Sequence, residues 1–374
     1  MTAKNRQWTT KQDGLDNLEL GETGIPEPKD GEVLVRIKAV SLNYRDTEVC
    51  QGEYTHHSSL DNGQPLVPCS DMAGEIVASK SPRWNQTGAR VLSIFNQTHL
   101  TGQIKESDLA SGLGFPLPGV LSQYRVFPDY ALVPIPDYLS DEEACTLPIA
   151  AVTAWTSING FRPLGEYLDL TNQTKTKDEK EKKPPPVLLA QGTGGVSVAA
   201  LQIAHAAGLA TIITSSSDDK LDRARKELSA DTGINYRTHW EWHEFVLEAT
   251  AGNGADYILE TGGADTLRRS FACVAFGGTI ACIGYLSGKD EDESSGDGGL
   301  NRLNVNVLAL RRNVTLRGIL NGPRDRFEEM LGFYEKKGIR PVVDKVFRFE
   351  EAKEAFQYLA KGAHFGKVVI KVAD

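Results

Sequence analysis

Residues 187–283 alternate short apolar runs with longer amphipathic runs, and this alternation constrains the fold more than any other feature. The apolar runs predict strands, and the longer runs between them predict helices. The predicted strands are 187–190, 210–214, 233–236, 256–259 and 278–283, and the predicted helices are 195–207, 218–228, 241–250 and 266–275. Because parallel strands need crossover helices, the fold class is α/β with a doubly wound parallel sheet.

The first 150 residues have a different pattern, which favours β structure. Glu32–Val40 alternates apolar and polar side chains, as a half-buried strand does. Glycine and proline separate the strand candidates, which is typical of a barrel-like sheet. Ser140 with Glu143 predicts a capped helix start. The other candidates are strands at 73–78, 89–95 and 124–134, a helix at 150–159, and a tail with strands at 342–347 and 367–372 around a helix at 349–360.

Two polar segments and the overall composition limit the function classes. Residues 171–186 and 290–299 hold too few apolar side chains to build a core, which predicts surface loops. The net charge of −9 argues against a nucleic-acid surface. No apolar run approaches the roughly 18 residues of a membrane span, and residues 1–8 lack the apolar stretch of a signal peptide. The five scattered cysteines indicate reduced intracellular thiols. We therefore expect a cytoplasmic protein with neither nucleic-acid nor membrane partners.

A glycine-rich turn follows the apolar run 187–190 and precedes a predicted helix. Its residues are Gly192, Thr193, Gly194, Gly195 and Val196. Strand, glycine turn and helix N-terminus together form a pyrophosphate site, because backbone N–H groups and the helix dipole both favour an anion. Ser197 stands where the fingerprint usually has its third glycine, and it is small enough for close packing. The alternative is a turn that only packs.

The next strand indicates which dinucleotide binds. An NAD site has a carboxylate at this strand end, but Ser215 and Ser216 stand here. Ser216 can donate to a 2′-phosphate and Lys220 can neutralise it, so we predict NADP(H). Tyr236, at the end of the following strand, is expected beside the adenosine. For Lys220, the alternative is an exposed helix lysine.

Four segments in order resemble the medium-chain dehydrogenase/reductase superfamily, in its zinc-independent quinone-oxidoreductase and zinc-type alcohol-dehydrogenase-like branch. They are Ser-Leu-Asn-Tyr-Arg-Asp at 41–46, Leu-Pro-Ile-Ala-Ala-Val-Thr-Ala-Trp at 147–155, Gln-Gly-Thr-Gly-Gly-Val-Ser at 191–197 and Gly-Lys-Val-Val-Ile at 366–370. The resemblance implies a GroES-like β-barrel catalytic domain at 1–150, completed by 325–374, and a Rossmann NADP(H)-binding domain at 151–324. It also implies a homodimer formed by edge pairing of two Rossmann sheets.

The zinc ligands of related enzymes are not matched. The corresponding positions here are Asn43, Ser70 and Ile149, and isoleucine cannot ligate zinc. The cysteine-rich structural loop is also missing, because 96–119 contains no cysteine. The adjacent pair at 56–57 could be proposed as metal-binding histidines, but neighbouring residues on a strand point to opposite faces. We predict no metal.

Without a Lewis acid, quinones and α,β-unsaturated carbonyls are easier hydride acceptors than simple carbonyls. By resemblance, Asn43 and Thr153 lie near the nicotinamide, Gly284 and Tyr285 reach its pocket through backbone groups, and Lys367 lies near the phosphates. Tyr54 is the candidate donor to the substrate, which makes Tyr54 and Asn43 the predicted catalytic residues. The alternatives are a packing role for Tyr54 and an ordinary strand lysine at 367.

Two other functions stay open from the sequence. One is an NADP-dependent alcohol or carbonyl dehydrogenase that uses other polar groups in place of zinc. The other is an NADPH-binding sensor or structural protein with little turnover. The sequence identifies neither the physiological substrate nor the proton donor, because both depend on the side chains that line the cleft.

Overall fold

The computed structural model describes residues 4–54, 65–172, 184–287 and 303–373. The chain divides into two compact units. Unit 1 comprises Met1–Val152 and Asn321–Asp374, and unit 2 comprises Thr153–Leu320. The divisions predicted from the sequence are at 150/151 and 324/325. The pair at 56–57, the segment 290–299 and most of 171–186 lie outside the described residues.

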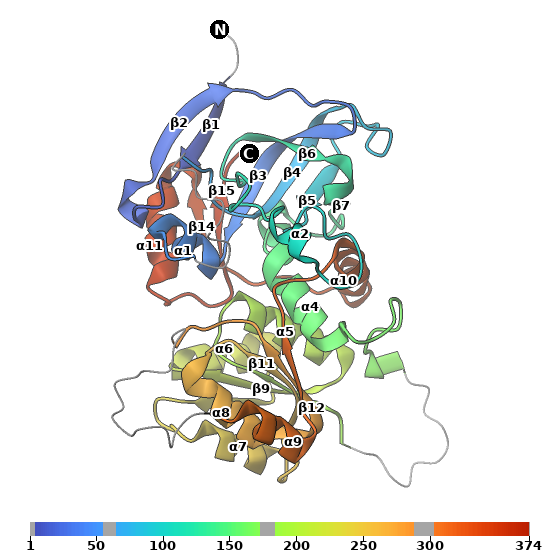
Figure 1. Ribbon diagram of the computed structural model, residues 1–374, viewed down its shortest axis with the longest axis vertical. Coiled ribbons are helices and arrows are strands. Elements are labelled where there is room, and N and C mark those ends of the chain that lie inside the picture. The colour runs from blue at the N-terminus through green and yellow to red at the C-terminus, as the bar shows by residue number, and fades with distance from the viewer. Residues whose placement is uncertain (1–3, 55–64, 173–183, 288–302, 374) are drawn as a thin grey trace. The chain divides into compact units, whose positions relative to one another are not determined.

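Unit 2 is a parallel six-stranded sheet with the order β10-β9-β8-β11-β12-β13. Its strands are β8 (Val187–Ala190), β9 (Ala210–Ser215), β10 (Thr232–Asn235), β11 (Ala255–Glu260), β12 (Val274–Cys282) and β13 (Thr315–Gly318). Its helices include α5 (Gly195–Ala207), α6 (Asp218–Leu228), α7 (Trp242–Ala249), α8 (Ala264–Cys273) and α9 (Val305–Arg312). Figure 1 shows α5 and α6 on one face of this sheet and α7 and α8 on the other. The strand order reverses between β8 and β11, which is where such folds bind nucleotides.

The predicted α/β alternation is confirmed, with element ends that differ by a few residues. The strand β8 is buried on both faces, since Leu188, Leu189 and Ala190 have no exposed surface. Two elements were missed, α9 and β13. No residue of α9 is buried, and three of the four residues of β13 are exposed, so neither carries the apolar periodicity that identifies an element.

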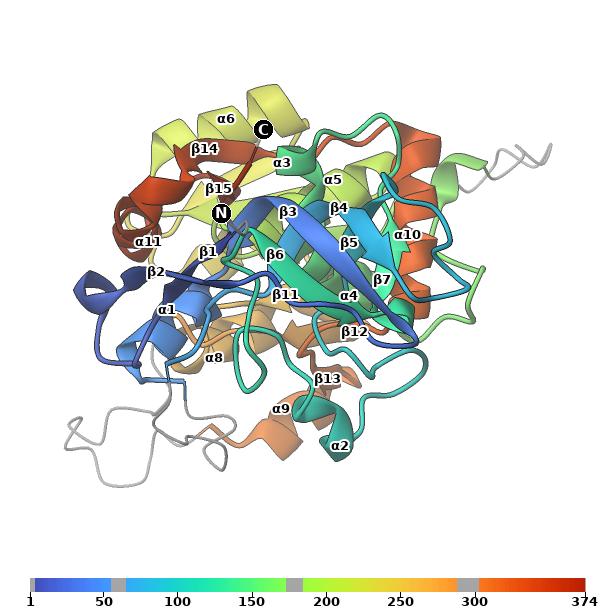
Figure 2. The same cartoon turned by 90° about the horizontal axis from the view of Figure 1, so that it is seen from above.

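Unit 1 contains a sheet of the order β14-β15-β3-β4-β5-β7, with β6 paired to β3. Figure 2 shows β3, β4 and β5 side by side. Among the described residues the pairings form an open order and not a closed ring. The strands are β3 (Glu32–Leu42), β4 (Asp71–Ser79), β5 (Arg90–Ser93), β6 (Tyr124–Pro128), β7 (Leu132–Pro134), β14 (Val343–Arg348) and β15 (Lys367–Lys371). The C-terminal strand β15 pairs antiparallel to β3, so both chain ends build one sheet.

Several expectations for unit 1 are corrected. The single strand predicted at 124–134 is two strands, β6 and β7, because a 3₁₀ turn at Asp129–Ala131 interrupts it. A separate hairpin of β1 (Lys4–Thr9) and β2 (Glu19–Gly24) and the helices α1 (Tyr44–Gln51), α2 (Glu106–Leu109) and α10 (Arg324–Lys337) were missed. The predicted helix 150–159 begins as a π turn at Leu147–Ala151 and continues as α4 (Val152–Asn159).

The cap signal at the next helix of unit 1 was read correctly. Helix α3 (Asp141–Ala144) has Ser140 as its N-cap, and the Ser140 side chain accepts from the Glu143 N–H. The helix α11 (Ala352–Ala360) packs on β15 and β14. No helix within the described ranges is long and apolar enough to cross a membrane.

Candidate active site

The turn between β8 and α5 has the backbone that its glycines predict. Gly192 has φ 73°, in the left-handed region that favours glycine. Gly194 is the N-cap of α5, and no side chain caps this helix end. A Cβ atom at either glycine would meet no atom within 4 Å, so the space in front of the turn is open. The first N–H groups of a helix lack intrahelical acceptors, and their positive end suits a pyrophosphate.

Ser197 does more than fill the place of the third glycine. Its Oγ donates to the Gln191 carbonyl oxygen at 2.6 Å, and Thr261 Oγ1 donates to the same oxygen at 3.0 Å. Ser197 is buried in the first turn of α5. The helix start is therefore tied to the residue that precedes the glycine turn. Thr193, within the turn, is also buried.

Glu260, the last residue of β11, was missed by the sequence analysis and connects several loops. It is 1 % exposed and accepts hydrogen bonds from Gln191 Nε2 at 2.8 Å, Gly262 N at 3.0 Å and Gly263 N at 3.1 Å. Ser270 Oγ and Thr266 Oγ1, both on α8, also donate to it. A single buried carboxylate thus fixes the turn after β8, the turn after β11 and the start of α8. In the sequence, the available signal for Glu260 is a carboxylate at the end of an apolar run.

The predicted 2′-phosphate residues lie together at the ends of β9 and β10. Ser215 is buried, its Oγ accepts from Ser217 N at 3.2 Å, and its carbonyl accepts from Tyr236 N at 3.0 Å. Ser216 and Lys220 are both partly exposed. The cap of α6 is Ser217, whose side chain accepts from Lys220 N.

Asp218 is the first residue of α6, and its carboxylate does not cap the helix. Its Oδ1 accepts from Asn235 Nδ2 at 2.9 Å. This carboxylate, the first after the end of β9, is therefore already engaged with the neighbouring strand β10.

Gly284 was expected to reach the nicotinamide pocket through its backbone groups. Its N–H donates to the Glu260 carbonyl oxygen at 3.3 Å, so that group already has an internal acceptor. A Cβ atom at this position would lie 2.9 Å from the Thr261 carbonyl oxygen, which explains why glycine is needed here. Tyr285 follows and is half-buried. Thr153 is buried on α4, where its carbonyl oxygen accepts from Ser157 Oγ.

In unit 1, Asn43 is buried at the N-terminus of α1. Its backbone N–H donates to Asp46 Oδ2 at 2.8 Å, which completes a capping box. Asp46 is also buried. Burial raises the pKa of Asp46 to about 6, although the neighbouring Arg45 guanidinium favours the charged form.

Lys367, the first residue of β15, is 6 % exposed. Its Nζ donates to the Leu42 carbonyl oxygen and to Asn43 Oδ1, each at 2.6 Å. Burial lowers the pKa of Lys367, and the carboxylates of Asp71 and Asp46 oppose that change. We predicted this lysine near the cofactor phosphates. Its two acceptors in the structure are interior groups of unit 1, and its place near the phosphates stays a prediction.

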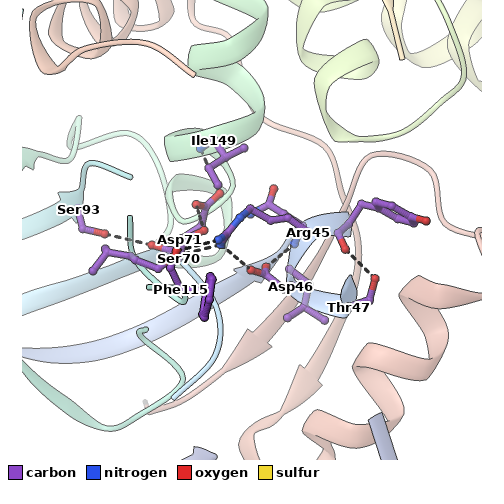
Figure 3. Close-up of polar contacts among 12 residues, drawn as sticks. Arg45, Asp46, Thr47, Ser70, Asp71, Ser93, Phe115 and Ile149 are labelled. Carbon is purple, nitrogen blue, oxygen red and sulfur yellow. Dashed lines mark hydrogen bonds and ion pairs between the residues drawn. The ribbon is translucent and has the colours of Figure 1, made fainter. Parts of the chain in front are cut away.

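Figure 3 shows Asp71 beside Ser70 and Ile149, two of the three positions that the sequence analysis compared with zinc ligands. Its Oδ1 accepts from Ser70 Oγ at 2.9 Å, and its Oδ2 accepts from the Ile149 backbone N–H at 3.2 Å. Burial raises the pKa of Asp71, with Lys367 as the largest opposing influence. Ile149 takes part through its backbone alone, since its side chain has no polar atom.

Tyr54 is half-buried and packs against Arg45, whose guanidinium carbon lies 4.8 Å from the centroid of the Tyr54 ring and 4.8 Å from that of Phe95. Arg45 also donates to the carbonyl oxygens of Leu113 and Phe115, at 3.1 Å and 3.2 Å. These contacts match the packing role that was the alternative for Tyr54. Its role as a donor to substrate stays a prediction.

Comparisons with known proteins agree with this architecture. Residues 29–137 match the alcohol dehydrogenase GroES-like domain, and residues 195–336 match the zinc-binding dehydrogenase family. A zinc-type alcohol dehydrogenase-like protein of Schizosaccharomyces pombe is 39 % identical over 96 % of both chains. The crystal structure of a putative alcohol dehydrogenase from Sinorhizobium meliloti 1021 has a TM-score of 0.82 and 36 % identity, with both chains fully covered. The structure of an NAD-dependent alcohol dehydrogenase has a TM-score of 0.78 and 30 % identity, over 98 % of this chain and 100 % of that one.

Proposed function

Because this chain belongs to the medium-chain dehydrogenase/reductase superfamily and is an NAD(P)H-dependent oxidoreductase, we propose that it uses NADPH, without zinc, to reduce a quinone or an α,β-unsaturated carbonyl. The observation that carries the zinc-free part of the proposal is the 2.6 Å hydrogen bond from Lys367 Nζ to Asn43 Oδ1. That bond occupies the only zinc-capable oxygen of the Asn43 side chain with an ammonium group.

The donor set does not fit zinc. Structural and catalytic zinc sites use cysteine, histidine or carboxylate ligands, and at least three from the protein. Ile149 offers no ligand atom, and the Ser70 hydroxyl donates to Asp71. In the ranges that the structure describes, no group of three or more histidine, cysteine or acidic side chains is arranged to hold a metal ion.

The chemistry then depends on polar groups of the chain. Bound NADPH would supply a hydride to the acceptor, and a solvent proton would complete the reduction. In quinones and conjugated enones the resulting negative charge spreads onto an oxygen atom, which a hydrogen-bond donor stabilises. Asn43 is buried, and its side chain hydrogen-bonds to the Asp71 carboxylate. An amide nitrogen carries two hydrogens, and we propose that the second hydrogen of Asn43 Nδ2 is donated to this oxygen.

The NADPH preference rests on the end of β9. A carboxylate there would bond the ribose 2′-hydroxyl of NAD, whereas this chain has Ser215 and Ser216, and Asp218 is held by Asn235. One solved relative is described as NAD-dependent, so the cofactor preference of this chain has to be measured. Dissociation constants for NADPH and NADH answer it, with Ser216→Asp as the test variant. We expect tighter NADPH binding in the wild type and a shift toward NADH in the variant. Tighter binding of NADH by the wild type would contradict the proposal.

The decisive assay for the reaction follows NADPH oxidation with three acceptor classes: a quinone, an enone and a simple aldehyde. We expect turnover with the first two. Turnover restricted to the aldehyde, or to alcohol oxidation with NADP⁺, would support an alcohol or carbonyl dehydrogenase, the function that the names of the similar proteins favour. Tight NADPH binding without turnover on any acceptor would support a sensor or structural role.

Exposed apolar side chains near one edge of the unit 2 sheet support the expected homodimer. The strand β13 is the outer strand of the sheet, and Leu316 on it is exposed. Leu310 on α9 and Phe276 on β12 are 82 % and 76 % exposed. Unpaired edge strands with apolar side chains favour association. We expect a dimer in light scattering and a monomer for Leu316→Lys, with exposed Leu164→Lys as the control. A monomeric wild type would refute this.

A further inference from the structure

Arg45, in the first turn of α1, is a cation held in place from several sides of unit 1. Its side chain is only 10 % exposed, and Nη1 lies 3.4 Å from Asp46 Oδ1. The guanidinium also donates to the carbonyl oxygens of Leu113 and Phe115, at 3.1 Å and 3.2 Å. A buried guanidinium is stable only when it is paired and hydrogen-bonded, and these three contacts meet that need. The fold therefore gives this group one defined position.

The chain returns to Arg45 after the end of α1. Gly52 ends the helix with φ 73°, and the N–H groups of Gly52 and Glu53 donate back to carbonyl oxygens of the last turn. This Schellman motif reverses the direction of the chain. A Cβ atom at Gly52 would lie 2.7 Å from the Gln12 carbonyl oxygen, so the turn requires glycine. The residue delivered by this turn is Tyr54.

The Tyr54 ring is restricted by contacts on its face and with a neighbouring ring. The Arg45 guanidinium carbon lies 4.8 Å from the Tyr54 ring centroid, and equally far from that of Phe95. The rings of Tyr54 and Phe115 lie 6.2 Å apart with an interplanar angle of 85°. Both arrangements are favourable for an aromatic ring, because its face is negative and its edge is positive. Tyr54 is therefore held in one orientation although it is only half-buried.

Arg45 also determines how the Tyr54 hydroxyl group can be used. The two side chains are joined by a hydrogen bond. A guanidinium group can only donate hydrogen bonds, so the Tyr54 oxygen is the acceptor in this bond. The hydroxyl hydrogen takes no part in the bond to Arg45 and points away from the guanidinium.

We infer that Arg45 is a positioning residue for Tyr54: it holds the ring by its face and the hydroxyl oxygen by a hydrogen bond, so that the hydroxyl hydrogen is donated to the oxygen of the substrate. The inference rests on the proposed reduction of a quinone or enone, in which negative charge develops on that oxygen. The packing contacts of Tyr54 and its predicted role as a donor are then two parts of one arrangement.

The first test is a double-mutant cycle with Arg45→Met and Tyr54→Phe. The matched control is Arg340→Met, because Arg340 lies over the ring of Tyr138 elsewhere in unit 1 and is exposed. We expect each single variant to lower kcat for quinone reduction by about 10- to 100-fold, on the scale of losing one oriented donor. The double variant should lie within about 2-fold of the slower single variant, because both changes remove the same interaction.

Several outcomes of the cycle would overturn the inference. They are losses that multiply in the double variant, a wild-type kcat in Tyr54→Phe or Arg45→Met, and a loss in Arg340→Met as large as that in Arg45→Met. The Kd for NADPH should change by less than about 2-fold in Arg45→Met, because a group that acts on the substrate oxygen does not bind the cofactor. Arg45→Lys keeps a cation and a donor, so it should recover part of kcat.

The second test needs no turnover. Labelling with fluorotyrosine marks all 11 tyrosines, and Tyr54→Phe identifies the Tyr54 signal in the fluorine NMR spectrum by its loss. We expect Arg45→Met to move this signal toward that of free fluorotyrosine, because the ring loses the cation on its face. Arg340→Met should leave it in place. A Tyr54 signal that does not move in Arg45→Met would overturn the positioning role.

The proposed function and this inference fail in different ways. A wild type that oxidises NADPH with neither a quinone nor an enone would refute the proposed reduction, while the NMR signal would still report whether Arg45 holds Tyr54. A wild type that reduces quinones, with Tyr54→Phe and Arg45→Met equally active, would refute only the inference. Melting temperatures identify variants that do not fold, and Arg45→Lys takes the place of Arg45→Met in both tests if the latter is one of them.

Discussion

The most informative single substitution in unit 2 is at Glu260. Its carboxylate accepts hydrogen bonds from Gln191, Gly262 and Gly263 and from two hydroxyls on α8. Bonds to a charged acceptor contribute about 1.5–3 kcal/mol each, and removal of one partner of a buried charged network costs about 3–5 kcal/mol. Glu260→Ala should therefore lose about 3–5 kcal/mol of stability. Glu260→Gln should lose about 2 kcal/mol, because one oxygen remains but an NH₂ group then faces other donors.

The loss has a clear thermal signature. For a unit of this size, 1 kcal/mol corresponds to about 2–4 °C, so Glu260→Ala should lower the melting temperature of unit 2 by on the order of 10 °C. Differential scanning calorimetry measures it, with Glu248→Gln, at an exposed position on α7, as the control. NADPH binding should weaken in parallel, because Gln191 and the turn after β8 lose their anchor. A Glu260→Ala protein that melts with the wild type would refute the network argument.

Two further predictions concern a glycine of the turn and a buried carboxyl group. Gly194→Ala should weaken NADPH binding by about tenfold, equivalent to about 1.4 kcal/mol, and change the melting temperature little, because the φ of Gly194 is −79° and the new Cβ meets no protein atom. Gly277→Ala, at a positive φ, should lower the melting temperature and leave NADPH binding unchanged. Equal NADPH affinity in both variants would argue against the pyrophosphate site. Asp46 binds its proton more tightly in the folded state, with a pKa of about 6 against 3.8, so its contribution should reduce stability by about 3 kcal/mol as the pH rises from about 4 to about 6. Urea unfolding across that range should show a smaller decline for Asp46→Asn than for the wild type, and parallel curves would contradict the assignment.

The elements of unit 2 were predictable where the signal is local. The apolar run of β8, the glycine turn and the start of α5 follow one another in sequence, and the structure gives both elements the predicted bounds. The cap of α3 was likewise read from Ser140 and Glu143, three residues apart. In each case the physical cause lies within a few residues of its effect.

The elements that were missed lack such a local cause. The edge strand β13 is ordered by its register with β12, where Leu316 pairs with Ile280, and its own side chains are mostly exposed. A carboxylate at the end of a strand is common and does not by itself indicate a network. The network at Glu260 forms only in the fold, where Gln191 and residues of α8 donate hydrogen bonds to it. Tertiary pairing, and not composition, selects both.

The same reasoning explains why the sequence alone did not bring Lys367 to Asn43. The two residues are 324 positions apart, and their contact exists because β15 adds to the edge of β3 in one register. A shift of that register by one residue would turn Lys367 to the opposite face of the sheet, and the buried carboxylates Asp46 and Asp71 would lose a cation. The cluster and the register therefore stabilise each other. A chain with Lys367→Met should consequently lose stability, and a melting temperature equal to that of the wild type would contradict this argument.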